Sequence, residues 1–334
     1  MPRRWERLAE TLAGIEEIYI VLHDDPDPDA IASGEALRYL LAETSGIEGQ
    51  LVYRGVIGRA ENKALVDYLK ITLLQLPEGD FETDKPVVLL DTQPGAGNNP
   101  LPAGQPVVAV IDHHAQPPED DDSFYDVRPW IGASSTILTQ YLRAAECKPT
   151  MKLATALFYG IKTDTKALSR DTSAADVAAY FYLLPFVEVD ALVEIENAQV
   201  PAAYFRNLAK AMDGARVYGD VVISTLGKMD YPDLAAEIAD LFLRLEGVEW
   251  VICMGSYEDD LYLSVRARQE DADADALARA VVGERGSAGG RNTLAGGQIP
   301  LDGRDLQQVA GDACRRTLKF LEIPIDTEGE PLLT

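Results

Sequence analysis

One stretch decides how the chain is organised: Val107-Val108-Ala109-Val110-Ile111-Asp112-His113-His114. Its first five residues are apolar and mostly β-branched, which is typical of a buried strand. They run without a break into one acid and two of the three histidines of the chain. The third histidine, His23, follows another strand-like run at residues 18–22. Because ligands bind at the carboxyl ends of strands in open α/β sheets, we expect all three histidines at a ligand-binding edge.

Apolar runs of this kind alternate with helical patterns through the first half of the chain. The pair Asp27-Pro28 is a typical helix start, with an acid at the N-cap and proline at the first helical position. Continuous apolar strands separated by helices favour an α/β fold with a doubly wound, mostly parallel sheet. The predicted strands are residues 18–22, 50–53, 85–90 and 107–111, and the predicted helices are 30–42, 60–68, 134–145 and 151–159.

The length of 334 residues is large for a single hydrophobic core, so we expect two domains. A helical pattern from 172 to 212 is broken at Pro185 and Pro201, which places the junction there. Strand patterns at 217–225, 250–257 and 261–267 and helical patterns at 234–245 and 303–321 follow. We therefore predict a first α/β domain at 1–186, a helical linker or hinge at 187–215, and a second, smaller α/β domain at 216–334.

The formal net charge of −25 limits the partners that this surface can accept. It repels polyanions, so long duplex nucleic acid and an anionic membrane are disfavoured. A short phosphorylated substrate remains compatible if metal ions and a few arginines reverse the potential locally. The acidic residues 119–122 are expected to form a solvated surface segment.

The three cysteines, Cys147, Cys253 and Cys314, are scattered and lack metal-ligand spacing. They indicate core packing in a reducing compartment. The first residues alternate basic and acidic side chains, without the apolar segment of a signal peptide. No apolar run approaches the roughly 18 residues of a membrane span. The expected location is the cytoplasm.

Polar residues at strand ends and first helical turns form a candidate metal site. Neutral imidazole and carboxylate together suit divalent transition ions, manganese above all, with magnesium, cobalt or zinc as alternatives. With this many ligands two ions fit better than one, and a shared aspartate can hold them about 3.5–4 Å apart with a bridging hydroxide as nucleophile. Taken singly, the acids could be helix caps or turn formers. The candidates are His23, Asp27, Asp29, Asp91, Asp112, His113, His114 and Asp164.

Four spaced motifs resemble the successive motifs of the DHH phosphoesterase superfamily. They are His23-x-Asp25-Pro26-Asp27-x-Asp29-Ala30, then Asp91, then Asp112-His113-His114, then Gly160-Ile161-x-Thr163-Asp164-Thr165. A later segment, Gly289-Gly290-Arg291 through Ala295-Gly296-Gly297, resembles the glycine motif of the DHH-associated C-terminal domain. Within the superfamily, the layout is similar to the branch of oligoribonucleases and 3′-phosphoadenosine-5′-phosphate phosphatases.

The resemblance implies two metal ions that share Asp91. It implies that Asp112 orients the histidines and that His114 donates to the substrate phosphate, with Asp112, His114 and Asp91 forming the catalytic group. The implied ligands are His23, Asp27 and Asp91 for the first ion and Asp29, Asp91, His113 and Asp164 for the second.

In the C-terminal domain, the resemblance implies that Arg266 and Arg291 grip phosphate. Arg291 departs from the family pattern, in which a histidine is usual, but an arginine still binds anions bidentately. Four glycines of this segment would let backbone N–H groups approach a phosphate closely, namely Gly289, Gly290, Gly296 and Gly297. The alternatives are a solvent-facing strand residue for Arg266 and a plain flexible loop for the glycine segment.

These features predict a manganese-dependent phosphoesterase that hydrolyses short phosphorylated nucleotides, either oligoribonucleotides or 3′,5′-bisphosphonucleotides. Two other functions stay open: a manganese-dependent inorganic pyrophosphatase, and a nucleotide-binding regulator that does not hydrolyse its ligand. The expected partner is a short nucleotide or another phosphorylated small molecule, without long duplex nucleic acid or membrane, and a homodimer is a further expectation.

Overall fold

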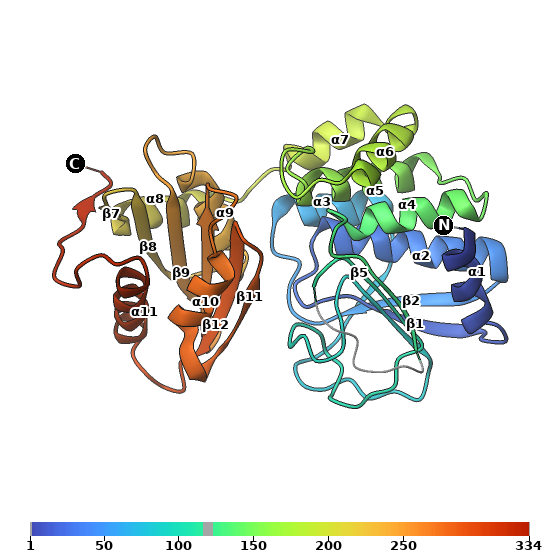
Figure 1. The fold of residues 1–334 in the computed structure, drawn as a ribbon, viewed down its shortest axis with the longest axis horizontal. Coiled ribbons are helices and arrows are strands. Elements are labelled where there is room, and N and C mark those ends of the chain that lie inside the picture. The colour runs from blue at the N-terminus through green and yellow to red at the C-terminus, as the bar shows by residue number, and fades with distance from the viewer. Residues whose placement is uncertain (1, 116–122, 334) are drawn as a thin grey trace. The chain divides into compact units, whose positions relative to one another are not determined.

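The computed structural model describes residues 2–115 and 123–333 of the chain, so the predicted surface segment at 119–122 lies outside the described residues. The chain forms two compact units, Met1–Ala198 and Gln199–Thr334, each with its own sheet and core (Figure 1).

The first unit contains a sheet of six strands in the order β3-β2-β1-β4-β5-β6. Every neighbouring pair is parallel. The order reverses between β1 and β4, and in doubly wound sheets this switch point is where ligands bind. The predicted parallel sheet of an α/β fold is thus confirmed, although the short β3 and β6 were not predicted. The strands are β1 (Glu17–Val21), β2 (Glu48–Tyr53), β3 (Leu73–Gln75), β4 (Val87–Leu90), β5 (Ala109–Asp112) and β6 (Phe124–Val127).

Both faces of this sheet are buried, which explains why its strands are continuous apolar runs rather than alternating ones. Ile20, Val88 and Ile111 pack on the helical side, whereas Val21 and Val110 pack on the opposite side against residues from loops. Helices α2, α4 and α5 pack against one another on the helical side (Figure 1). The helices of this unit are α1 (Pro2–Thr11), α2 (Pro28–Ser45), α3 (Ala60–Leu69), α4 (Ser134–Ala144), α5 (Met151–Asp164), α6 (Ala174–Leu183), the 3₁₀ turn η1 (Leu184–Phe186) and α7 (Val189–Glu196).

Helix α5 is longer than the sequence pattern predicts. The predicted helix ends at residue 159, yet the helix continues through Gly160 to Asp164. Glycine is unfavourable inside a helix by roughly 1 kcal/mol. Here tertiary packing overrides that propensity, because Gly160 lies against the backbone of Asp29 on α2, where a side chain would not fit.

The second unit is built on a mixed sheet of seven strands in the order β11-β12-β10-β9-β8-β7-β13. Helices α8 and α9 belong to the core on one side of it, and α10 and α11 to the core on the other. The elements are α8 (Ala202–Gly214), β7 (Arg216–Tyr218), β8 (Val221–Lys228), α9 (Leu234–Phe242), β9 (Trp250–Tyr257), β10 (Asp260–Ala267), α10 (Ala274–Val282), η2 (Gly283–Arg285), β11 (Ser287–Gly290), β12 (Leu294–Pro300), α11 (Leu306–Phe320) and β13 (Glu330–Pro331).

The boundary between the units, after Ala198, falls inside the segment 187–215 for which a linker is predicted. Helix α7 packs on α3 and α5 of the first unit, and α8 packs on β8 of the second. The helices expected in the linker are therefore shared between the two units, and a hinge there stays a prediction. Within the two described ranges, no helix has both the length and the apolar character needed to cross a bilayer.

Candidate metal centre

Three adjacent strands bring polar residues to one edge of the first sheet. Asp91 follows β4 directly, Asp112 is the last residue of β5, and His23 lies two residues beyond β1. Because β1, β4 and β5 are neighbours and parallel, their carboxyl ends meet at the same edge, which is also the switch point. The topology of the sheet confirms the prediction that these residues lie at one edge.

Asp91 lies at the centre of the cluster. Its Oδ2 is 3.7 Å from His23 Nε2, its Oδ1 is 3.3 Å from His113 Nε2, and Ser134 Oγ donates to Oδ1 at 2.8 Å. The residue is almost fully buried and has a φ of 60°, a left-handed conformation that aspartate tolerates better than most residues. Each carboxylate oxygen therefore faces a different histidine, which is the arrangement that a bridging ligand requires.

The first group of ligand-type atoms consists of His23, Asp27 and Asp91, all within 4.8 Å of one another. His23 Nε2 is 3.8 Å from Asp27 Oδ1. His23 Nδ1 lies 2.7 Å from the carbonyl oxygen of Asp24. When Nδ1 donates to that carbonyl, Nε2 keeps its lone pair for a metal ion that the carboxylates of Asp27 and Asp91 would also bind. Asp27 also caps α2 by accepting from the backbone N–H of Asp29 and Ala30, so the cap and the predicted ligand are the same side chain.

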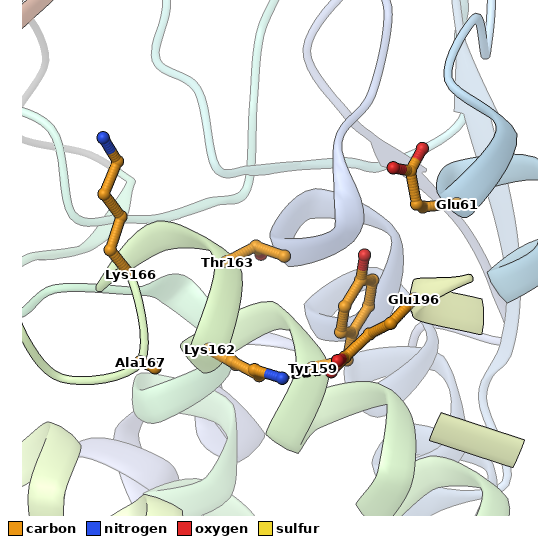
Figure 2. A pocket seen from close by; sticks show the side chains of 7 residues that line it. All are labelled: Glu61, Tyr159, Lys162, Thr163, Lys166, Ala167 and Glu196. Carbon is orange, nitrogen blue, oxygen red and sulfur yellow. Dashed lines mark hydrogen bonds and ion pairs between the residues drawn. The ribbon is translucent and has the colours of Figure 1, made fainter. Parts of the chain in front are cut away.

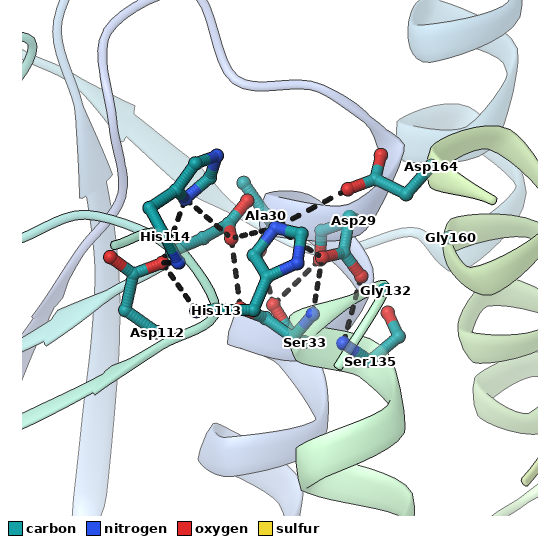
Figure 3. Close-up of polar contacts among 12 residues, drawn as sticks. Asp29, Ala30, Ser33, Asp112, His113, His114, Gly132, Ser135, Gly160 and Asp164 are labelled. Atoms are coloured by element: carbon teal, nitrogen blue, oxygen red, sulfur yellow. Dashed lines mark hydrogen bonds and ion pairs between the residues drawn. The ribbon is translucent and has the colours of Figure 1, made fainter. Parts of the chain in front are cut away.

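The second group consists of Asp29, His113 and Asp164 (Figure 3). His113 Nε2 is 3.9 Å from Asp29 Oδ2 and 3.4 Å from Asp164 Oδ2. His113 Nδ1 lies 3.2 Å from the carbonyl oxygen of Ile131, which orients the ring. Asp29 and His113 are buried, and Asp164 is partly exposed at the end of α5.

The separations between donor atoms fit a metal ion. A metal–ligand bond of about 2.1 Å places the donor atoms of neighbouring ligands roughly 3.0–3.4 Å apart. The measured gaps of 3.3–3.9 Å between histidine nitrogens and carboxylate oxygens are close to that range. Two imidazoles and four carboxylates form a donor set that suits manganese and related divalent ions.

The pKa values within the cluster are perturbed by burial and by charge. Burial raises the pKa of Asp29 well above its usual range, and the neighbouring charges of Asp91 and Asp27 raise it further. Burial lowers the pKa of His23, but Asp27 and Asp91 outweigh that effect and the pKa ends well above the usual value. Burial raises the pKa of Asp91, but His113 and the other two histidines outweigh it and lower the pKa. Without metal, protons on His23 and Asp29 therefore offset the negative charge of the cluster, and a divalent ion would take their place.

Asp29 is held rigidly by the start of α4. The backbone N–H of Ser134 donates to Oδ2 at 2.6 Å, and that of Ser135 donates to Oδ1 at 2.8 Å. The unpaired N–H groups of a helix N-terminus favour a negative charge. The anion that this helix start binds is thus a side chain of the cluster itself.

Gly160 allows α5 to reach the cluster. A Cβ at this position would lie 2.5 Å from Ser135 Oγ and 3.1 Å from the Cα of Asp29. Only glycine permits that approach of α5 to α2 and α4, and it brings Asp164, one turn further along α5, to face His113. The glycine of the fourth motif therefore acts by packing.

Asp112 forms a third group of ligand-type atoms with Asp91, His113 and His114, all within 4.8 Å of one another, and its hydrogen bonds go to the histidine loop. Its Oδ1 accepts from the backbone N–H of His113 at 2.6 Å and of His114 at 3.1 Å, and it lies 2.9 Å from His114 Nδ1. The residue is fully buried. These contacts are those of a residue that orients the loop, and they leave His114 half exposed at the rim of the cluster.

Sequence reasoning missed Gln93, which lies in a loop interpreted only as a series of turn formers. Gln93 is buried, and its Nε2 donates to Asp112 Oδ2 at 2.8 Å and to the carbonyl of His114 at 2.9 Å. Asn99 Nδ2 donates in turn to the carbonyl of Gln93 at 2.9 Å. A second missed residue, Arg54, donates from Nε to Asp24 Oδ1 at 3.1 Å and so supports the His23 loop. Nothing in the local sequence marks either residue, because both act on partners from other strands.

A pocket of about 350 Å³ lies at the C-terminal end of α5, where Tyr159, Lys162 and Thr163 line it (Figure 2). It belongs wholly to the first unit, and Lys162 forms an ion pair with Glu196 at its side. Its lining of two acids and two bases has no formal net charge, so it offers no strong preference for an anion. The lining residues are Glu61, Tyr159, Lys162, Thr163, Lys166, Ala167 and Glu196.

In the second unit, Arg266 is buried on β10, so the alternative of a solvent-facing residue is wrong. Its Nε donates to Asp240 Oδ1 at 3.0 Å, and its Nη1 donates to the carbonyl of Val265 at 3.0 Å. To grip phosphate, as the family resemblance implies, this guanidinium would have to share its donors with Asp240. That role stays a prediction.

The glycine segment forms a β-hairpin, so the alternative of a plain loop is wrong. Gly289 on β11 pairs with Gly296 on β12, and the backbone N–H of Arg291 donates to the carbonyl of Leu294 at the turn. A Cβ at Gly289 would meet nothing within 4 Å, and one at Gly296 would meet only a backbone oxygen at 3.8 Å. This pair leaves a strip of backbone without side chains.

The other two glycines are explained by packing. A Cβ at Gly290 would lie 2.4 Å from Ala295 Cα, and one at Gly297 would lie 2.6 Å from a methyl of Val282. Both distances are shorter than any real contact, so these positions require glycine whatever the segment binds. Of the four predicted glycines, Gly289 and Gly296 are the ones open to a ligand.

Comparison with known proteins gives consistent relatives. The family model described as "DHH family, N-terminal domain" matches residues 17–161. An uncharacterized protein of Methanocaldococcus jannaschii is 33% identical over 314 residues, which cover 92% of this chain and 64% of that protein. A probable manganese-dependent inorganic pyrophosphatase of Listeria innocua is 29% identical over 146 residues, 43% of this chain and 46% of that protein. The chain thus spans about half to two thirds of the length of these relatives.

One solved structure resembles both units. An exopolyphosphatase-related protein from Bacteroides fragilis superposes with a TM-score of 0.67 at 15% identity, covering 96% of this chain and 97% of that one. At that identity the similarity establishes the fold alone.

Proposed function

We propose that the chain, whose residues 17–161 match the DHH family N-terminal domain, is a divalent-metal-dependent phosphoesterase. One observation carries the proposal. Buried Asp91 presents one carboxylate oxygen to His23 and the other to His113, between two groups of ligand-type side chains. Such an arrangement is suited to holding two ions for displacement at phosphorus.

The residues of the cluster divide the work. His23, Asp27 and Asp91 would hold one ion, and Asp29, Asp91, His113 and Asp164 the other. When bound, the ions would supply an activated water and neutralise charge on the phosphoryl group.

The residues around the ligands position the substrate. Asp112 holds the ring of His114 at the half-exposed rim, from which the imidazole can donate to a phosphate oxygen or protonate the leaving oxygen. The start of α4 fixes Asp29, so that ligand needs no reorganisation when the substrate binds.

We propose manganese as the metal and a short phosphorylated nucleotide as the substrate. The mixture of imidazole and carboxylate donors supports manganese. The net charge of −25 disfavours long polyanions but allows a short one at a metal-loaded site. Within the second unit, the groups that we propose for binding phosphate are the open backbone at Gly289 and Gly296, Arg291 at the adjoining turn, and Arg266. The free cysteines support a reducing, cytoplasmic location.

Hydrolysis assays test this proposal directly. Purified protein with manganese should release mononucleotides from a di- to pentanucleotide, or phosphate from a 3′,5′-bisphosphonucleotide. Replacing Asp91 by alanine should lower the rate by several orders of magnitude, because both ions lose a ligand. Asp67→Ala, at an exposed position of α3, is the matched control and should keep full activity. If none of these substrates yields product, the proposal is refuted.

A second candidate is a manganese-dependent inorganic pyrophosphatase. The similarity to the Listeria innocua protein favours it, although that match covers 43% of this chain. The hairpin glycines of the second unit argue against it, since a pyrophosphate site would be crowded with lysine and arginine side chains instead. Hydrolysis of pyrophosphate at a much higher rate than hydrolysis of nucleotides would establish this alternative. Tight nucleotide binding without turnover would instead indicate a nucleotide-binding regulator.

A further inference from the structure

Helix α6 and the turn η1 present an apolar surface to solvent. Val177, Phe181 and Leu184 are spaced four and three residues apart and are 37%, 60% and 45% exposed. Side chains at this spacing share one face of a helix. Phe186 on η1 is 38% exposed, and on the following α7 Val189 and Val193 are 62% and 52% exposed. These six residues are called the α6–α7 surface below.

The opposite face of α6 accounts for the stability of the helix within the first unit. Ala179 and Leu183 are buried, and the ring of Tyr180 packs on Phe158 of α5 with centroids 4.0 Å apart. The exposed side chains are therefore not needed for the core of this unit. Exposed apolar side chains gathered on consecutive helices of a folded protein indicate an interaction site.

The charge distribution narrows the choice of partner. The single charged residue of α6, Asp176, is buried and accepts from the backbone N–H of Gly132 at 2.9 Å and from Thr136 Oγ1 at 2.6 Å. The exposed face of α6 is thus uncharged in a chain of net charge −25. Two copies of an acidic protein repel each other least where both surfaces lack charge, as on α6, so the exposed acids Asp190 and Glu194 of α7 would have to face solvent at the edge of the contact.

The same segment is unsuited to a membrane. Residues 174–196 contain no lysine or arginine. Helices that bind an anionic bilayer carry basic side chains beside their apolar face. The acids Glu188, Asp190 and Glu194 would instead be repelled by such a bilayer.

We propose that the α6–α7 surface is the interface of a homodimer, in which two copies of this chain pack the same surface against each other. The area is sufficient. A standard interface buries about 800 Å² per partner, of which about 60%, or roughly 500 Å², is apolar. Since an aromatic side chain has about 200 Å² to bury, Phe181 and Phe186 at their exposed fractions supply about 200 Å². The four aliphatic residues, with the exposed Ala174, Ala178 and Pro185, supply the remainder of that requirement.

Analytical ultracentrifugation of the whole chain tests the proposal. The protein should sediment with twice its chain mass of 36.4 kDa. Phe181→Glu places a charge on the apolar face of α6, which a two-fold interface would bury in both copies, and should weaken dimerisation by at least 100-fold. Val177→Glu, at the same face of α6, should act in the same direction and decides the matter if Phe181→Glu does not fold.

Phe205→Glu is the matched control, because Phe205 is also 60% exposed but lies on α8 in the second unit. It should leave the dimer intact. A wild-type chain that stays monomeric at its highest soluble concentration would overturn the proposal. So would dimers that survive the α6 substitutions, or that dissociate equally with the control. The ultracentrifugation result does not depend on catalytic activity. The test of the dimer is therefore independent of the proposed function.

Discussion

A methyl group added at Gly160 tests the packing that brings α5 to the metal centre. In an exposed helix, a change from glycine to alanine stabilises the fold by roughly 0.8–1 kcal/mol. At Gly160 the new Cβ would lie 2.5 Å from Ser135 Oγ and 3.1 Å from both Cα and Oδ1 of Asp29. Overpacking of a well-packed core costs about 1–3 kcal/mol, so the steric effect should outweigh the helix propensity.

We therefore expect Gly160→Ala to lower the stability of the metal-free first unit by up to about 2 kcal/mol, a fall in Tm of several degrees. Gly311→Ala in α11 is the control, since its Cβ would meet nothing closer than Arg315 Nη1 at 3.7 Å. That variant should be as stable as the wild type or more so. Differential scanning calorimetry on the two variants measures both changes.

The functional effect of Gly160→Ala should exceed its effect on stability. Displacing α5 moves Asp164 away from His113, and displacing Asp29 disturbs its contacts with α4, so two proposed ligands of one ion shift together. A shift of about 1 Å in catalytic geometry can reduce the rate by about 100-fold. Manganese affinity measured by titration calorimetry should fall at least tenfold. A variant that is stabilised like Gly311→Ala, with unchanged manganese affinity, would refute the packing argument.

Three further predictions follow from particular contacts. Removing metal with a chelator should lower the Tm of the first unit, because ligand at 100 times its Kd stabilises a fold by about 2.7 kcal/mol; thermal melts of Asp91→Asn should show no such difference between metal and chelator. Gln93→Leu should remove the donor that holds Asp112 and the carbonyl of His114, lowering kcat about 10- to 100-fold with a smaller change in KM. Gln93→Asn should not restore kcat, because the amide of the shorter side chain does not reach these two acceptors. Burial raises the pKa of Tyr141 to about 12, although the charges of nearby arginines oppose this shift. The neutral phenol therefore contributes stability below about pH 10 that is lost as the pH rises to about 12. Urea unfolding should show a loss of about 2–3 kcal/mol in the free energy of unfolding across that range in the wild type and a smaller loss in Tyr141→Phe.

Much of the candidate site could be predicted because it depends on strand ends. His23, Asp91 and Asp112 each follow an apolar run, and parallel strands of one sheet carry their carboxyl ends to one edge whatever the details of packing. Asp27 could be placed because helix caps are local features of the sequence. The sequence by itself therefore determined the fold class, the edge at which the site lies and the residues that gather there.

The tertiary structure decided how those residues are held. Asp29 is fixed by N–H groups 105 and 106 positions away in the chain, and Asp112 by Gln93, which belongs to the loop after a different strand. Gly160 looks like a helix terminator in the sequence, but its helix continues because α2 and α4 leave room for no side chain there. Likewise, the glycine segment becomes a hairpin because β12 pairs with β10 as well as with β11. In each case the deciding partner is distant along the chain, and local propensity carries no information about which distant group will be within hydrogen-bonding or van der Waals reach.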